Sequence, residues 1–470
     1  MAWKNIFSIG VDGLDRLLGD ALTPGVSIVI AGHPGSGKTT LASTICYTNA
    51  LRGHKCLYVS FQESKQKLVR NMRRLGIDFN LIESKKLFHF VKYPLVVDAN
   101  AMQEIIEGIT SLVVNVKPKV LVIDSITPLL KAVGSNIKAR SVLQNFFAEL
   151  PDLIEGIVVL ITEIPMSEER IEIGDIEFVA DIIIILRHRV ERNLLIRDLE
   201  IRKVRGAAIT LARMPFTIVE GKGIVAYAPV VLEEIPPPKH RKLEFHCSVL
   251  RKYLEYVKKG QIVYITYPSD ARPVPIYVHF LGFAYLNNLK VLLISYKSSP
   301  QELKELMLSA MRELSVDEDL AMRLINKHFI IKGINPASLG TGQLGLWEIR
   351  LIEELRPDAV VFHGVDIVAN IEDPITWRVG LLNQMLHLKS LGILIIRMGS
   401  YDDRYVWHTS LADLVFKLYL TKEKDELKYN LYMWKRGKSP VILNQEELIK
   451  CREEVAEIIK KSSLAGIPCK

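Results

Sequence analysis

A glycine-rich run near the start of the chain has the residue types and spacing to bind a nucleoside triphosphate. It fits the phosphate-loop pattern Gly-x4-Gly-Lys-Thr and comprises Gly32, His33, Pro34, Gly35, Ser36, Gly37, Lys38, Thr39 and Thr40. The glycines allow a tight turn, so that backbone N–H groups can point at the β-phosphate. Lys38 would reach the β- and γ-phosphates, and Thr39 would be a ligand of Mg²⁺.

A carboxylate farther along the chain could complete this metal site. Asp124 ends the apolar run 120–124 and precedes a serine. An aspartate in this place can hold the coordination shell of Mg²⁺ through water. The same residue type is also common as a helix cap or a turn residue. Because a phosphate loop lies upstream, we expect the metal role.

The apolar runs around these residues predict a parallel sheet covered by helices. The loop follows a predicted strand, 26–31, and opens a predicted helix, 38–51, as phosphate binding requires. Further buried strands are predicted at 55–61, 120–124, 157–162 and 181–186, and a helix at 103–115. Continuous Val, Ile and Leu runs between helices are typical of a parallel sheet with both faces buried.

The chain repeats this pattern after a proline-rich segment. Three consecutive prolines in 236–242 predict an extended linker. Four strand motifs of the first half then recur in the same order. We therefore expect two tandem α/β domains, residues 1–235 and 243–470, each with a mainly parallel sheet flanked by helices.

The second half lacks the residues that would bind phosphate. The residues that stand in place of the loop glycines, lysine and threonine are Asp270, Arg272, Pro273 and Val274. His363 stands where the first half has Asp124. Prolines also remove N–H donors from the place that needs them. We expect no ordinary binding of Mg²⁺ and nucleotide there, and a structural role for the second half.

Bulk composition favours a soluble cytoplasmic protein. The 470 residues are 49% hydrophobic and 24% charged, and no apolar run is long enough to span a bilayer. Lys4 and Asp12 interrupt the first residues, so we expect no signal peptide. The net charge of +8 permits an acidic partner without demanding nucleic acid. The nine glutamines, against abundant Ile, Lys, Arg and Glu, indicate a thermophile, such as an archaeon.

Cysteine usage predicts the redox state of the chain. The five cysteines form no Cys-x-x-Cys pair and are odd in number. Disulfides are rare in a cytoplasm, and a structural zinc site usually has closely spaced ligands. We therefore expect reduced thiols and no zinc site.

The first half carries further short motifs beside the loop and the Asp-Ser step at 124–125. They are 10–15, 57–63, 70–71, Gly76, 177–181, 203–206 and 215–218. Together these motifs resemble the KaiC-like branch of the RecA-type ATPases, over about residues 5–230. The resemblance implies RecA-like domains that bind ATP with Mg²⁺. It also implies a ring, most simply a homohexamer, with ATP between subunits. The second half follows the family only in outline.

The resemblance further implies which residues act on the γ-phosphate. In the family, two glutamates follow the third strand, and the first activates the attacking water. Here the pair is Gln62 and Glu63. Glutamine can orient a water but is a poor proton acceptor, so we expect slow hydrolysis. Glu63 could substitute or could cap the next helix, and residues 162–163 stand where the family senses the γ-phosphate.

Lys203 and Arg205 match a cation pair that crosses the subunit interface in the family. Such cations, supplied in trans to the neighbour's γ-phosphate, are worth about 10³–10⁵ in rate in related nucleotide hydrolases. The alternative is a solvated basic strand, since further arginines lie nearby in the sequence. We expect the trans role.

These inferences favour a ring ATPase that acts as a nucleotide-dependent regulatory or signalling switch towards a protein partner. We expect slow hydrolysis in the first half and no autokinase step, because in the family that step belongs to the second lobe. One alternative is a RecA/RadA-like recombination or repair accessory that binds DNA through the basic stretch 65–74. Another is a non-catalytic scaffold that binds ATP only to assemble.

Overall fold

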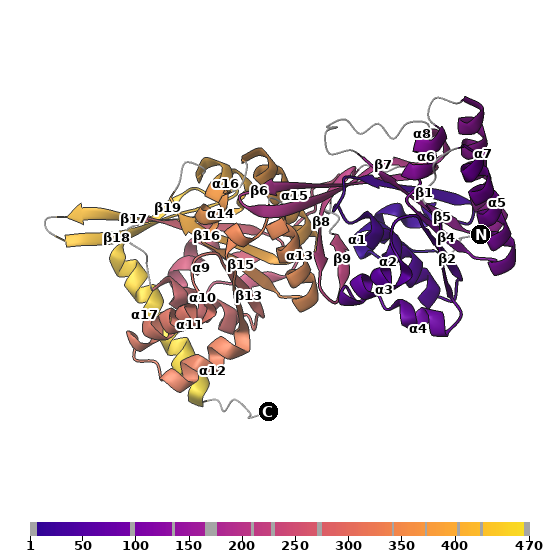
Figure 1. Cartoon of the computed structure of the whole chain (residues 1–470). Coiled ribbons are helices and arrows are strands. Elements are labelled where there is room, and N and C mark those ends of the chain that lie inside the picture. The colour runs from indigo at the N-terminus through magenta and orange to yellow at the C-terminus, as the bar shows by residue number, and fades with distance from the viewer. Residues whose placement is uncertain are drawn as a thin grey trace. The chain divides into compact units, whose positions relative to one another are not determined.

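The computed structural model describes residues 7–94, 99–133, 137–164, 176–207, 211–226, 231–269, 275–340, 343–371, 374–401, 405–423 and 426–464. The chain divides into two compact units, Met1–Ala228 and Pro229–Lys470. Each unit is a mainly parallel sheet flanked by helices (Figure 1), which confirms the predicted fold class. Within the described ranges, no helix has the length and apolar character needed to cross a membrane.

The first unit is built on one sheet with the strand order β3-β2-β4-β5-β1-β6-β7-β8-β9. Pairing is parallel from β3 to β6 and antiparallel from β6 to β9. The strands are β1 (Val26–Gly32), β2 (Cys56–Ser60), β3 (Phe88–Lys92), β4 (Val120–Asp124), β5 (Ile157–Glu163), β6 (Ile182–Glu191), β7 (Leu194–Val204), β8 (Arg213–Val219) and β9 (Gly223–Ala226). The glycine-rich run thus follows the central strand β1.

Helices cover both faces of this sheet (Figure 1). Successive side chains of a strand point to opposite faces, so Ile28 and Ile30 of β1 pack in one core and Val29 and Ala31 in the other. The first core includes α2, and the second includes α5 and α7. The helices are α1 (Asp12–Leu18), η1 (Gly19–Ala21), α2 (Lys38–Leu51), α3 (Lys65–Arg74), α4 (Phe79–Ser84), α5 (Ala99–Val116), α6 (Thr127–Val133), α7 (Ile137–Ile154) and α8 (Ile176–Val179).

The second unit has a sheet with the order β14-β13-β15-β16-β12-β17-β18-β19 and a small β10-β11 pair. The strands are β10 (Lys242–Glu244), β11 (Tyr256–Lys258), β12 (Ile262–Tyr267), β13 (Val291–Ser295), β14 (Phe329–Gly333), β15 (Ala359–His363), β16 (Leu394–Ser400), β17 (Leu414–Glu423), β18 (Glu426–Lys435) and β19 (Val441–Leu443). With β12 taken as the counterpart of β1, the main sheet repeats the order of the first unit up to β8. The common topology supports the internal duplication.

Two apolar cores again lie on the two faces of the sheet of the second unit. One contains α9 to α12 with α17, and the other contains α13 to α16. The helices are α9 (Ser248–Leu254), α10 (Ile276–Leu286), α11 (Pro300–Arg312), α12 (Glu318–His328), η2 (Pro336–Ser338), α13 (Gln343–Leu355), α14 (Val365–Ile371), α15 (Pro374–Ser390), α16 (Tyr405–Leu411) and α17 (Gln445–Leu464). Cys451, Val455 and Ile459 of α17 are buried, so this helix is part of the core.

The prediction of reduced thiols is wrong for four of the five cysteines. Cys46 pairs with Cys56 and Cys247 pairs with Cys451, with Cα atoms 5.9 Å and 5.2 Å apart. The second pair is 204 residues apart in sequence. Packing of α17 on α10 and α9 brings these two sulfurs together, and no local spacing rule can detect such a contact. Cys469 lies outside the described residues.

The proline-rich segment is hydrogen-bonded to the second unit. The backbone N–H of Lys239 donates to the carbonyl of Lys259 at 2.9 Å, and the N–H of Lys259 donates to the carbonyl of Arg241 at 3.1 Å. At least this part of the segment therefore belongs to the second unit.

Candidate functional site

The phosphate loop connects the central strand to the first long helix of the first unit. β1 ends at Gly32, flanked by β5 and β6, and α2 begins at Lys38. Gly35 and Gly37 have φ angles of +79° and +103°, a region that favours glycine. A Cβ on Gly32 would collide with the carbonyl oxygen of Leu186. The sequence pattern therefore reflects real backbone constraints.

Lys38 is buried at the start of α2, with its ammonium group inside the curve of the loop. Its Nζ donates to the carbonyl oxygens of Gly32 at 2.8 Å and His33 at 2.9 Å. Burial lowers the pKa of Lys38, whereas the carboxylates of Glu163 and Asp124 oppose the shift. A cation held in this way can turn from backbone carbonyls to the oxygens of a phosphate.

Asp124 lies at the end of β4 and receives two side-chain hydrogen bonds. Thr39 Oγ1 donates to its Oδ2 at 2.9 Å, and Tyr58 OH donates to the same atom at 2.8 Å. Burial raises the pKa of the Asp124 carboxyl, and the hydrogen bonds from Tyr58 and Thr39 oppose that shift. The structure thus brings together the two residues that the sequence offered as metal ligands.

The described residues fit a triphosphate with Mg²⁺. Ser36 is fully buried within the loop, and its Oγ has no hydrogen-bond partner among the residues that the structure describes. A hydroxyl left in this way suits a ligand oxygen. Thr39 and Asp124 supply the oxygen ligands that Mg²⁺ prefers. Of the remaining loop residues, Pro34 and Gly35 are exposed, His33 is half-buried and Thr40 is buried.

Gln62 and Glu63 diverge although they are adjacent in sequence. Gln62 Nε2 donates to Glu163 Oε1 at 3.0 Å. Glu63 instead forms an ion pair with Lys67 at 3.1 Å, one turn along the chain in α3. Glu163 ends β5 and pairs in register with Gly32, so its carboxylate lies on the loop side of the sheet.

Lys203 and Arg205 lie at the opposite edge of the sheet from the phosphate loop. In β6, Leu186 pairs with the loop residue Gly32, whereas Ile183 pairs with Lys203 of β7. Three residues of strand correspond to about 10 Å, and β7 lies two strands away from β1, so the two cations do not reach the phosphate loop of the same chain. Lys203 Nζ donates to the carbonyl oxygen of Glu177 at 2.8 Å. Arg205 Nη1 donates to Asp181 at 3.0 Å.

Sequence reasoning missed three residues beside the loop. Tyr58 is a tyrosine in an otherwise small and aliphatic strand, and that contrast was the available signal. His188 and Arg197 face each other across β6 and β7, and each has a buried ring or guanidinium nitrogen without a partner among the described residues. Burial lowers the pKa of His188, and the nearby positive charges of His33, Arg197 and Lys38 lower it further. The positive charges and unpartnered nitrogens around His188 and Arg197 would favour an anion beside the loop.

The second unit keeps the strand positions and changes the side chains. His363 pairs in register with Ser295, just as Asp124 pairs with Ser60. The Nδ1 of His363 lies 3.0 Å from Ser295 Oγ, in a buried position. Residues 270, 272, 273 and 274, which stand in place of the loop residues of the first unit, lie outside the described residues. Asp366 of α14 accepts a hydrogen bond from Ser400 Oγ at 2.6 Å.

The arginine–aspartate pair at the far edge of the sheet occurs in both units. Arg436 Nη1 lies 3.6 Å from Asp413 Oδ1, as Arg205 does at 3.0 Å from Asp181. Lys203, in contrast, has Trp434 at the corresponding place on β18. The arginine–aspartate pair therefore does not require a phosphate loop, and of the two cations Lys203 is the one that differs between the units.

A phosphate loop after the central strand, with a buried lysine and a Thr–Asp pair, defines the first unit as a RecA-type P-loop ATPase domain. A family model described as "ATPase: KaiC" matches residues 7–230. The described geometry and this match agree that the first unit is a KaiC-like domain.

Curated relatives match the same part of the chain. The circadian clock protein KaiC3 of Synechocystis is 30% identical over 225 residues, which are 46% of this chain and 44% of that protein. The circadian clock oscillator protein KaiC of Picosynechococcus is 27% identical over 215 residues, 46% of this chain and 41% of that protein. KaiC2 of Synechocystis is 31% identical over 180 residues, 36% of this chain and 30% of that protein. The chain thus matches less than half the length of these relatives.

Proposed function

We propose that the chain is a ring-forming ATPase that hydrolyses ATP slowly in its first unit and signals its nucleotide state to a protein partner. The observation that carries this proposal is the convergence of Thr39 and Asp124 beside the buried Lys38. The KaiC-like family of the first unit supports an ATP-binding ATPase. The slow rate, the ring and the signalling role are the finer parts of the proposal.

The residues of the site would divide the work of phosphoryl transfer. Lys38 and the backbone N–H groups of the loop would hold the phosphates, and Thr39 and Asp124 would hold Mg²⁺. When bound, Mg²⁺ would neutralise charge that develops on the β- and γ-phosphate oxygens. The side chains of Gln62 and Glu163 would orient a water molecule for attack on the γ-phosphorus.

The proton of that water needs an acceptor, and Glu163 is the better placed carboxylate. Attack forms the bond from water oxygen to γ-phosphorus and breaks the bond to the β-phosphate oxygen, which leaves ADP and inorganic phosphate. Glu163 interacts electrostatically with Lys38 and lies beside the loop, whereas Glu63 is ion-paired with Lys67. The side chain beside Glu163 is Gln62, which is a poor proton acceptor, and not a second carboxylate. Turnover should therefore be slow.

The far edge of the sheet supports a trans arrangement. Lys203 and Arg205 are too far along the strands to reach the loop of their own subunit, so a role at a phosphate requires a neighbour. Phe178, close to this edge, is 79% exposed and lines a surface hollow with Arg205 and Asp181. An exposed aromatic residue beside a cation is typical of an interface between proteins.

Mixing of inactive subunits tests the trans arrangement. Asp124→Asn subunits lack their own Mg²⁺ carboxylate but keep Lys203, and Lys203→Ala subunits have the reverse defect. Mixed rings contain interfaces at which one subunit supplies an intact loop and its neighbour supplies Lys203. Such mixtures should regain part of the phosphate release that each variant alone has lost. If mixtures remain as inactive as the separate variants, Lys203 does not act in trans.

The first test of the proposed function measures mass in solution and phosphate release on the same samples, with and without Mg-ATP. Wild type should form an ATP-dependent ring with slow turnover, and Lys38→Ala should lose both. Asp124→Asn should lose turnover, whereas its counterpart His363→Asn in the second unit should keep it. Assembly without any phosphate release would instead favour the scaffold, and a monomer indifferent to ATP would overturn the proposal.

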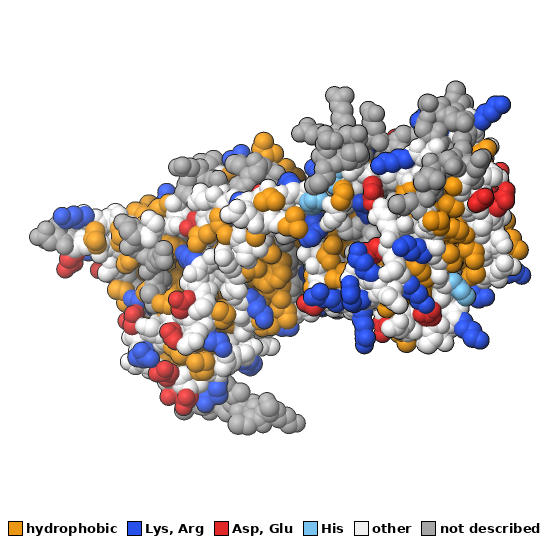
Figure 2. Space-filling model, viewed as in Figure 1, with side chains coloured by type: hydrophobic (Ala, Val, Ile, Leu, Met, Phe, Trp, Pro, Cys, Tyr) orange, Lys and Arg blue, Asp and Glu red, His pale blue; other side chains and the backbone are white. Residues whose placement is uncertain are grey.

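The DNA-binding alternative receives less support from the basic helix α3. Lys65 pairs with Glu83 and Lys67 pairs with Glu63, as expected for a solvated helix face. Figure 2 shows Lys and Arg side chains over this region with acidic side chains among them. DNA binding that weakens steeply between low and moderate salt would revive this alternative.

A further inference from the structure

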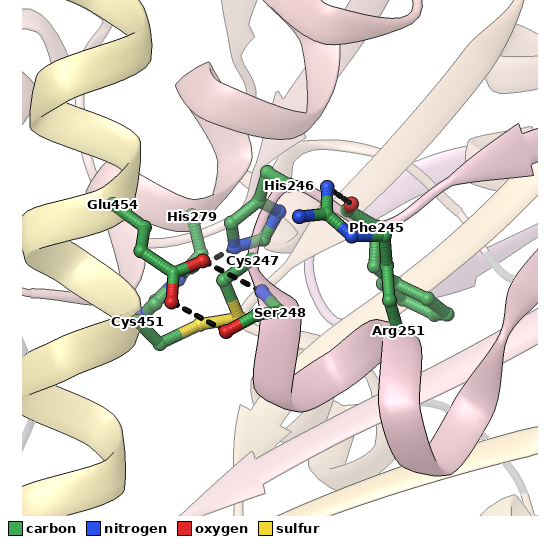
Figure 3. Close-up of a disulfide and its surroundings, with 8 residues drawn as sticks. All are labelled: Phe245, His246, Cys247, Ser248, Arg251, His279, Cys451 and Glu454. Carbon is green, nitrogen blue, oxygen red and sulfur yellow. Dashed lines mark hydrogen bonds between the residues drawn. A yellow bond between two sulfur atoms is a disulfide. The ribbon is translucent and has the colours of Figure 1, made fainter.

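Two histidines and two cysteines meet inside the second unit (Figure 3). His246 and Cys247 directly precede α9, His279 lies on α10, and Cys451 lies on the terminal helix α17. Three chain segments that are distant in sequence therefore contribute to one cluster. Cys247, Cys451 and His246 are at most 3% exposed.

The potential ligand atoms of this cluster are close together. One ring nitrogen of His246 and the sulfurs of Cys247 and Cys451 all lie within 4.8 Å of one another. His246 Nε2 lies 2.8 Å from His279 Nδ1. The other ring nitrogen of His246, Nδ1, is buried and has no hydrogen-bond partner among the described residues. Two sulfurs and two imidazole nitrogens form a donor set typical of tetrahedral zinc.

The disulfide and a metal ion exclude each other at this place. At zinc–sulfur distances of about 2.3 Å, two tetrahedral thiolates lie about 3.8 Å apart, far beyond a sulfur–sulfur bond of about 2.0 Å. Two imidazole nitrogens on the same ion lie about 3.4 Å apart, so the 2.8 Å pair of His246 and His279 needs only a small shift. Metal binding therefore requires that the Cys247–Cys451 bond opens and that His279, which is not part of the 4.8 Å group of His246 and the two sulfurs, approaches the ion.

We propose that the reduced protein binds one zinc-class divalent ion through His246, Cys247, His279 and Cys451, and that the disulfide is the metal-free, oxidised state of the same site. Two electrons and two protons from a dithiol reductant convert the disulfide into two thiols, and the reductant becomes a disulfide. Binding of the ion then releases the two thiol protons. The balance needs no further reactant.

Charge and access are compatible with such a site. Arg251 and Arg452 carry positive charge nearby, and two thiolates offset the charge of a divalent ion completely. Burial keeps both imidazoles uncharged at neutral pH, which is the form that binds metal. A cavity of about 390 Å³, lined by His246, His279 and Cys451 among mostly apolar side chains, adjoins the cluster.

Both states of the site would attach the terminal helix to the rest of the second unit. Glu454 of α17 accepts hydrogen bonds from the backbone N–H and the Oγ of Ser248, beside the disulfide (Figure 3). Either the disulfide or the metal ion adds a strong link to these contacts. Only the reduced, metal-free state lacks such a link, so α17 should be least stable in that state.

Cobalt titration of the reduced protein tests the proposal, because Co²⁺ reports coordination in its visible spectrum. Full-length protein is reduced without oxygen and its free thiols are counted. If the thiol count stays low, the chain is reduced in denaturant and refolded. One Co²⁺ per chain with the intense bands of tetrahedral thiolate coordination is expected, and Zn²⁺ should displace it. Oxidised protein should bind none.

Matched variants separate the site from general effects of reduction. Cys247→Ala should abolish the cobalt spectrum, and His279→Gln should weaken Co²⁺ binding by at least about tenfold. The double variant Cys46→Ala/Cys56→Ala, which removes the other disulfide, should bind Co²⁺ like wild type. Circular dichroism checks that each variant is folded. If one of the ligand variants fails to fold, His246→Gln is tested in its place.

Three results would overturn the proposal. They are an absence of Co²⁺ binding by the reduced protein at micromolar concentrations, an octahedral spectrum, and equal binding by the oxidised protein. Because the cluster belongs to the second unit and the phosphate loop to the first, none of these results depends on ATP binding or on turnover.

Discussion

The variant Tyr58→Phe removes one hydroxyl that holds Asp124 in place and leaves the Asp124 carboxylate itself unchanged. It therefore tests how much the position of this carboxylate matters for Mg²⁺ binding. Tyr58 is fully buried, and its OH donates to Asp124 Oδ2 at 2.8 Å. Its ring packs against Phe79, Phe88 and Phe90, contacts that phenylalanine would keep. Burial raises the pKa of Tyr58 well above its ordinary value, so the hydroxyl is a permanent donor at neutral pH.

The expected loss can be estimated from this single contact. A hydrogen bond to a charged group contributes about 1.5–3 kcal/mol, and its loss leaves Asp124 with Thr39 as its remaining side-chain donor among the described residues. Loss of such a supporting contact typically weakens metal binding by about 10–100-fold. The Asp124 pKa should rise further, so activation by Mg²⁺ should need a higher pH. In a unit of this size, about 2 kcal/mol lowers the melting temperature by about 4–8 °C.

Phosphate release measured against Mg²⁺ concentration at several pH values tests this reasoning. Tyr93→Phe is the matched control, because that hydroxyl lies beside Gly108 and not beside Asp124. Tyr58→Phe should shift the half-saturating Mg²⁺ concentration upwards, whereas Tyr93→Phe should leave it unchanged. An unaltered Mg²⁺ dependence of Tyr58→Phe, with a loss of stability below about 0.5 kcal/mol, would refute the positioning role of Tyr58.

Three further predictions follow from individual side chains. Because burial raises the pKa of Asp124, the stability associated with its protonated form is present below about pH 4 and is lost as the pH rises through the folded pKa. Asp124→Asn should remove this loss and stabilise the nucleotide-free first unit at pH 8 in denaturant unfolding; equal or lower stability would contradict it. Gln62→Glu should accelerate phosphate release if Gln62 limits the rate, and an unchanged or lower rate would reject that assignment. Burial also lowers the pKa of His279 to about 4, so the stability of the second unit should fall on the order of 2 kcal/mol between pH 6.5 and 4. His279→Gln should make this profile shallower, with the buried His246 contributing the remaining slope, and a wild-type profile that is already flat would contradict the prediction.

The phosphate loop and the fold class could be predicted because each depends on local sequence. Tight turns need glycine at 35 and 37, and buried parallel strands need continuous Val, Ile and Leu. The repeat after the proline-rich segment predicted a second sheet, and its strand order follows that of the first. These features are written in short windows of the chain, where residue type and spacing suffice.

The contacts between distant segments could not be predicted in the same way. The partner of Gln62 is Glu163, 101 residues away, while its sequence neighbour Glu63 turns to Lys67. Tyr58 supports Asp124 because β2 and β4 are neighbours in the sheet. Neither contact has a signal in spacing, since strand order depends on how helices pack over the two faces of the sheet.

The sequence by itself determined that the first unit has a phosphate loop and that the second lacks its residues. Tertiary structure decided that Lys203 lies at the edge of the sheet opposite the loop, and that Cys247 and Cys451 meet beside two histidines. The physical reason is the range of the interactions. Backbone conformation and strand burial depend on neighbouring residues, whereas a cluster of ligands depends on the packing of whole helices.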